Sequence, residues 1–178
     1  MKKLALALLF CGVSAFATTV TYTTTGLFAS DSLSSISLGG MTITYTPVSV
    51  ADSVTSPSFT NVGSFLVSGA GSASFSDTFT LKIDQTVPTV GNSSTTSSVT
   101  GTLTGTSSGI ALSFAPSTFT IGTASWEMFN TPLAPPSTNG GLTTLQAYVS
   151  VAPEPMSLSL MGGGLALVGL FARRRFAK

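Results

Sequence analysis

The side chains of this chain that could do chemistry are few, and most of them are carboxylates. The chain has no histidine, and Cys11, its one cysteine, lies inside an apolar N-terminal run, where it is interpreted as a small hydrophobic residue. Without histidine a Ser-His-Asp or Cys-His site cannot be built, and the usual zinc ligand sets are missing. We therefore expect no enzyme of these classes and no cofactor.

Asp77 is the acid in the most unusual position. It falls on the apolar side of an alternating pattern, where a carboxylate needs hydrogen bonds or a cation to offset its desolvation. A local bulge or turn that returns Asp77 to solvent is the favoured interpretation. A calcium site and carboxylate-based hydrolysis of a glycosidic bond are the alternatives. The other acids considered as calcium ligands are Asp31, Asp52 and Asp84.

The aromatic residues suggest a different kind of site. Trp126, the only tryptophan, stands beside Glu127 and near Phe129. If its ring were exposed, it could stack on a sugar while the carboxylate binds hydroxyl groups, so Trp126 is a candidate glycan contact. The favoured interpretation is that Trp126 fills the core or seals one end of the domain. The same two alternatives stay open for the three tyrosines, Tyr22, Tyr45 and Tyr148.

Charged residues are sparse between the two ends of the chain. Over residues 18–151 five acids stand against Lys82 alone, so the whole-chain net charge of +1 is set by the basic ends. A basic surface for nucleic acid is absent, and no nucleic-acid partner is expected. Serine and threonine make up nearly a third of the chain, but the regular alternation of apolar residues indicates a folded sheet rather than disorder.

The elements that position these residues are expected to be β-strands. Apolar residues alternate with Thr and Ser over 41–46 and 73–83, and a period of two is that of a strand. Shorter runs lie at 20–24, 64–68, 99–106, 110–115, 119–123 and 145–151, with a long hairpin loop expected over 86–96 and an irregular connection over 130–141. The prediction is one all-β domain, an antiparallel β-sandwich of jelly-roll or immunoglobulin-like type.

Three features follow one another at the C-terminus. They are Pro153-Glu154-Pro155, the uncharged run 156–172, and Arg173-Arg174-Arg175. As a helix at about 1.5 Å per residue, the run would be roughly 26 Å long, at the short end of what crosses a membrane. The arginines would stay in the cytoplasm, which leaves the domain outside it. The prolines favour an extended backbone before the helix, as protease clefts commonly require.

This tripartite order resembles a PEP-CTERM sorting signal. The resemblance covers residues 151–178 and says nothing about the fold of the rest of the chain. It implies recognition and cleavage at the Pro-Glu-Pro motif by exosortase, a membrane-embedded cysteine protease of Gram-negative bacteria. Proteins with this signal are generally associated with exopolysaccharide and biofilm production. The alternative is an ordinary single-span anchor that follows a proline turn.

The N-terminus has the layout of a secretory signal peptide. Lys2-Lys3, the apolar stretch 4–13 and Ala15-Phe16-Ala17 form the n-region, the h-region and the cleavage site. Signal peptidase is expected to cleave after Ala17 and to leave Thr18 as the new N-terminus. The mature chain would then contain no cysteine, so no disulfide could stabilise it.

These patterns predict a signal peptide over 1–17, a β-sandwich over 18–151 and a sorting signal over 152–178 with a transmembrane helix at 156–172. The protein is expected to be exported, held transiently in the inner membrane, and then released to the cell surface or the extracellular matrix. A structural or interaction role follows, with exopolysaccharide as a candidate partner. A carbohydrate-binding module and a permanently anchored periplasmic protein are the alternatives.

Overall fold

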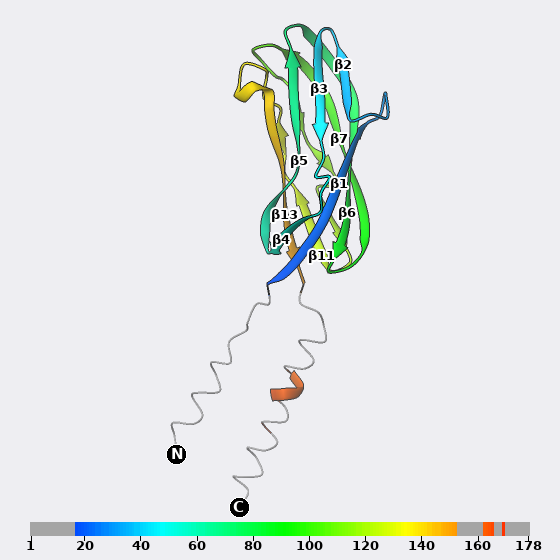
Figure 1. Cartoon of the computed structure of the whole chain (residues 1–178), viewed down its shortest axis with the longest axis vertical. Helices are drawn as coiled ribbons and strands as arrows, with labels where there is room; N and C mark the ends of the chain where they lie inside the picture. The colour runs from blue at the N-terminus through cyan, green and yellow to red at the C-terminus, as the bar shows by residue number, and fades with distance from the viewer. Residues whose placement is uncertain (1–16, 153–161, 166–168, 170–178) are drawn as a thin grey trace, which may run out of the picture.

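The computed structural model describes residues 17–152, 162–165 and 169 (Figure 1). Residues 162–165 and 169 are helical. No helix in the described residues combines the length and the hydrophobicity that a membrane span requires. Residues 1–16 of the predicted signal peptide and most of the helix predicted over 156–172 lie outside the described residues.

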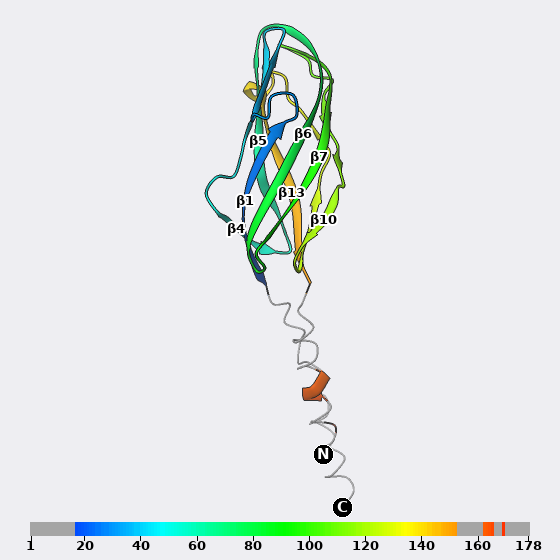
Figure 2. The ribbon, with the colours of Figure 1, turned by 90° about the vertical axis from the view of Figure 1, so that its right-hand side faces the viewer.

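Thirteen strands within the described residues form two antiparallel sheets and one short pair. The first sheet comprises, in spatial order, β4 (Asp52–Ser56), β1 (Thr18–Phe28), β6 (Ser72–Val87), β7 (Gly91–Thr104) and β9 (Phe114–Ala115). The second comprises β10 (Thr118–Ile121), β11 (Ala124–Met128), β13 (Leu142–Val151), β5 (Ser58–Gly69), β3 (Met41–Thr46) and β2 (Ser35–Leu38). The sheets lie as two layers along the molecule (Figure 2), which confirms the prediction of an all-β, antiparallel, sandwich-like domain.

The strands with the clearest alternation are confirmed. β3 covers 41–46 and β6 contains the whole of 73–83. The weaker runs at 20–24 and 64–68 lie inside β1 and β5, and the run at 145–151 lies inside β13. The connection over 130–141 is irregular as predicted, apart from β12 (Thr131–Pro132), which pairs with β8 (Ala111–Leu112), and the 3-10 turn η2 (Asn139–Gly141).

The long hairpin loop predicted over 86–96 is wrong. β6 and β7 are joined by residues 88–90 alone, and their ladder runs without a register shift from Gln85↔Gly91 to Ser72↔Thr104. The inward positions at the start of β7 are Thr95 and Ser97, both buried. Thr95 donates to the Pro116 carbonyl at 2.7 Å, and Ser97 accepts from the Ser113 amide at 2.8 Å. Because these buried positions carry hydroxyls, the sequence shows no apolar alternation there.

Besides β12, three strands were not predicted. β2 and β4 are short strands at the edges of their sheets and have few buried side chains. β11 has the alternation of a strand, since Ala124, Trp126 and Met128 are buried and the residues between them are exposed. β11 has only five residues, so its alternation is short, and Trp126 was considered only as a core residue or a glycan contact.

The core between the sheets contains a cluster of aromatic rings around Phe79. The Phe79 ring lies 4.9 Å from those of Tyr45 and Phe65 and 5.3 Å from that of Phe28, measured between centroids. All four residues are almost completely buried. A Cβ atom at Gly63 would overlap the Tyr45 ring, and the φ of +131° at Gly63 disfavours any other residue. Glycine is therefore required where β5 passes this ring.

Two tyrosine hydroxyls bind backbone carbonyls inside the core. Tyr45 donates to the Val62 carbonyl at 2.5 Å and accepts from the Thr24 hydroxyl at 3.0 Å, since its single proton is already used. Tyr22 donates to the Asn61 carbonyl at 2.6 Å. Both carbonyls belong to β5 beside the register shift in its pairing with β13. Tyr22 and Tyr45 are therefore core residues and not exposed glycan contacts.

Burial makes these two tyrosines sensitive to alkaline pH. Burial, together with the nearby Asp52 carboxylate, raises the pKa of Tyr22 to about 12, and burial raises the pKa of Tyr45 as well. The ordinary value is about 10, so each hydroxyl loses its proton more readily in the unfolded chain. The stability that the two neutral hydroxyls give the fold is fully present below pH ~10 and falls as the pH rises above it; for Tyr22 the loss is complete once the pH passes ~12.

We expect the free energy of unfolding to fall between pH ~10 and ~12 by about 1.4 kcal/mol per pH unit for each tyrosine. Urea unfolding of the purified chain at a series of alkaline pH values measures this slope. The double variant Tyr22→Phe, Tyr45→Phe should be less stable at neutral pH and should have a much flatter profile. An unchanged slope in the double variant would contradict the assignment.

Candidate functional site

Of the residues at the two predicted processing sites, the structure describes Ala17 and Thr18. Thr18 is the first residue of β1, and Ala17 precedes it as an exposed residue. β13 ends at Val151, one residue before the exposed Ala152. The other predicted processing and topology residues, Pro153, Glu154, Pro155, Arg173, Arg174 and Arg175, lie outside the described residues.

The start of β1 and the end of β13 lie at the same end of the molecule. Thr18 pairs with Ser56 of β4, and the Val151 amide donates to the Ser56 hydroxyl at 2.7 Å. Figures 1 and 2 show the two strand ends emerging from one end of the sandwich. Ser56 thus connects the first and the last strand. The opposite end of the sandwich carries connections between strands, with η2 close to it (Figure 1).

Asp77 is held by hydrogen bonds and not by a bulge or a turn. It lies opposite Val99 in the unbroken β6–β7 ladder and is half-buried. Its carboxylate accepts from the Ser30 hydroxyl at 2.8 Å and from the Thr78 amide at 2.7 Å. The favoured interpretation of Asp77 was therefore wrong, because Ser30, in the segment after β1, and the neighbouring Thr78 amide supply hydrogen bonds that offset its desolvation.

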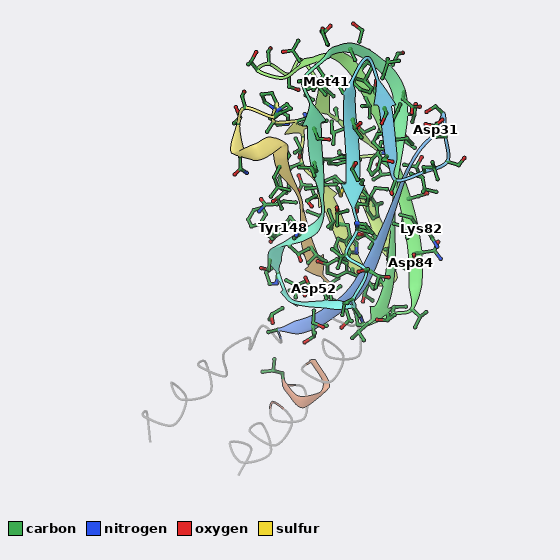
Figure 3. All side chains as sticks on the ribbon, turned by 45° about the horizontal axis from the view of Figure 1, so that its top comes forward. Asp31, Met41, Asp52, Lys82, Asp84 and Tyr148 are labelled. Carbon is green, nitrogen blue, oxygen red and sulfur yellow. The ribbon has the colours of Figure 1, made fainter. Side chains whose placement is uncertain are left out.

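The described carboxylates are not gathered into a cluster of metal ligands. No group of three His, Cys, Asp or Glu residues in the described part of the chain could hold an ion. Asp84 pairs with Lys82 at 2.7 Å, and Asp31 is exposed. Figure 3 shows Asp31, Asp52 and Asp84 in separate places around the sandwich. The calcium alternative for Asp77 is not supported.

Trp126 is a core residue. Its side chain is fully buried, and its ring meets Tyr22 edge-on with centroids 5.1 Å apart. Its Nε1 donates to Gln85 Oε1 at 3.1 Å. The Gln85 amide in turn donates to the carbonyls of Thr89 and Ile121, at 3.0 and 3.2 Å. The core interpretation is confirmed, and the candidate glycan contact at Trp126 is wrong because no ring face is exposed.

Three other aromatic rings meet on the outer face of the second sheet. Phe59 of β5 is 61% exposed, and its ring lies 5.3 Å from that of Tyr148 on β13 and 5.6 Å from that of Phe129, which follows β11. Tyr148 pairs with Phe59 on one side and with Glu127 on the other. We call these four residues the aromatic face. Figure 3 shows Tyr148 on the opposite side of the view from Lys82 and Asp84.

An irregularity in β5 places Phe59 outside. In a regular strand Phe59 and Phe65 would point the same way, because they are an even number of residues apart. Val62 and Gly63 are both buried, and the pairing with β13 shifts at this point. Phe65 therefore points into the core while Phe59 points to solvent. Phe59 was not predicted as a site residue, and Gly63 in the middle of the strand was the available signal in the sequence.

The surroundings of the aromatic face are polar but carry little charge. Glu127 is its only charged member, and the neighbouring side chains of Asn61 and Gln146 are exposed amides that pair across β5 and β13. Among the described residues the one cation is Lys82, which lies on the first sheet. The arrangement can offer stacking surfaces, one carboxylate and neutral hydrogen-bonding groups, but no positive charge.

Comparisons with known proteins found no match to this chain among family models, curated proteins or solved structures.

Proposed function

We propose that the chain is an exported bacterial protein of the cell surface or extracellular matrix, sorted by exosortase through its C-terminal signal. The observation that carries this proposal is the tripartite order at the C-terminus, from Pro153-Glu154-Pro155 through the run 156–172 to Arg173-Arg174-Arg175. The signal-peptide layout at the N-terminus agrees with it. The proposed partners are signal peptidase, exosortase and, transiently, the inner membrane.

The limits of the sandwich are compatible with processing at both ends. Cleavage after Ala17 would remove nothing from β1, and cleavage near Pro155 would remove nothing from β13. β1 begins and β13 ends at the same end of the molecule (Figure 1). A domain of this shape could be held close to a membrane by one end while its sheet faces stay accessible.

A structural or interaction role is part of the proposal. The described residues contain no histidine, no cysteine and no cluster of metal ligands. The connections β1–β2, β3–β4, β4–β5 and β5–β6 each pass from one sheet to the other. Such crossings are a feature of jelly-roll and immunoglobulin-like sandwiches, and we propose a module of this general kind.

Fractionation of native cells with and without exosortase tests the proposal. With exosortase, an antibody to the domain should detect a shortened chain outside the inner membrane. Without exosortase, the same antibody should detect a longer chain in the inner membrane. An identical size and location in both strains would overturn sorting by exosortase, and would favour the permanently anchored alternative if the chain stays in the membrane.

A further inference from the structure

We propose that the aromatic face, formed by Phe59, Phe129, Tyr148 and Glu127, binds a neutral polysaccharide. This inference rests on the proposed function for where the polysaccharide is met, and on the structure for the site itself. It replaces Trp126 as the site of the carbohydrate-binding alternative.

The three rings offer an apolar surface on which a sugar can lie. The centroids of Phe59 and its two neighbours are 5.3 and 5.6 Å apart, and the residues come from β5, β13 and the segment after β11. These separations, with angles of 59° and 42° between the ring planes, are those of aromatic side chains that pack on one another, so the three rings form one continuous surface. The apolar C–H face of a sugar ring can lie on an aromatic ring, and the exposure of Phe59 leaves room for it.

The polar groups beside the rings are free to bind hydroxyls. Within the described residues, the Glu127 carboxylate, the Gln146 amide and the Tyr148 hydroxyl form no side-chain hydrogen bond or ion pair. Glu127 and Gln146 are exposed, and they lie on strands next to one another in the sheet. A carboxylate, an amide and a phenol together can accept from and donate to the hydroxyls at the rim of a sugar ring.

The charges on and near the aromatic face favour a neutral ligand. An acidic polysaccharide would meet the Glu127 carboxylate and find no cation, since Lys82 lies on the first sheet and is paired with Asp84. A second copy of the chain fits no better, because packing this face on itself would bury Glu127 side chains without a basic partner. A neutral, hydroxyl-rich polymer needs no counter-charge and can use both the rings and the polar groups.

Affinity gel electrophoresis of the purified full chain in mild detergent tests the inference. The probes are neutral polysaccharides (a β-glucan, a mannan, a galactan and hydroxyethyl cellulose), with alginate as the acidic comparison. We expect retardation by at least one neutral polymer and none by alginate. Phe59→Ala should weaken that binding about tenfold, the effect of losing a central aromatic anchor, whereas Phe59→Tyr should retain it.

Leu27→Ala is the matched control, because Leu27 is 47% exposed on β1 of the other sheet. It should bind as the unaltered chain does. Circular dichroism of each variant separates loss of binding from loss of fold. Equal binding by Phe59→Ala and the control, binding of alginate alone, or binding of none of the polymers would each overturn the proposal. The assay uses the purified chain and does not depend on processing. A negative binding result would therefore leave the proposed sorting by exosortase unaffected.

Discussion

Replacing Pro153-Glu154-Pro155 by three alanines should keep the chain at its longer length in the inner membrane. The two prolines favour an extended backbone ahead of the membrane segment, and Glu154 is the only charge between Glu127 and Arg173. Without them the proposed protease has neither its motif nor a preset extended substrate. Immunoblots of membrane and extracellular fractions should show that the shorter form has disappeared.

The matched control replaces Pro135 and Pro136 by alanine. These prolines lie in the connection between β12 and β13, inside the domain and away from the tail. The control chain should be shortened and released like the unaltered one. If the alanine-substituted tail is processed at the normal rate, the Pro-Glu-Pro motif does not direct cleavage.

Trp126→Ala should destabilise the domain by about 3–5 kcal/mol. The substitution leaves a cavity where the largest buried side chain packs on Tyr22, and it leaves Gln85 Oε1 without its donor. Since small domains are stable by only about 5–15 kcal/mol, much of the variant could be unfolded at 37 °C. Urea unfolding followed by far-UV circular dichroism measures the loss, because the variant has no tryptophan to follow by fluorescence.

Phe59→Ala is the control for the Trp126 variant, as an aromatic-to-alanine change on the same sheet but on its outer face. Its side chain is mostly exposed, so its unfolding midpoint should shift far less. Equal losses in the two variants would mean that Trp126 is not part of the core. Comparing the stability of the two variants therefore distinguishes a buried aromatic residue from an exposed one.

The fold could be predicted from the sequence wherever buried positions are apolar. In β3 and β6 most inward residues are large and apolar, and Thr or Ser lies between many of them, so the period of two is visible. In the first half of β7 the buried residues are Thr95 and Ser97, whose hydroxyls are satisfied by contacts distant in the sequence. Contacts of this kind cannot be predicted from neighbouring residues, so a loop was predicted over 86–96.

The candidate site was only partly predictable for a related reason. Glu127, Phe129 and Tyr148 were noticed as candidates, but their face of the sheet depends on pairing between strands far apart in the chain. Phe59 depends on the irregularity at Gly63, which reverses the direction of the side chains that follow. The sorting signal is different in kind, because it is defined by the order of residues along the chain.

The most direct test of export with processing at both ends is the intact mass and C-terminal peptide of the mature protein, isolated from fractionated native cells. The account predicts a chain that begins at Thr18, ends near Pro155 and is found outside the inner membrane. A chain in the inner membrane that still carries Arg173-Arg174-Arg175 and Lys178 would contradict it, and would make the C-terminal segment a permanent anchor.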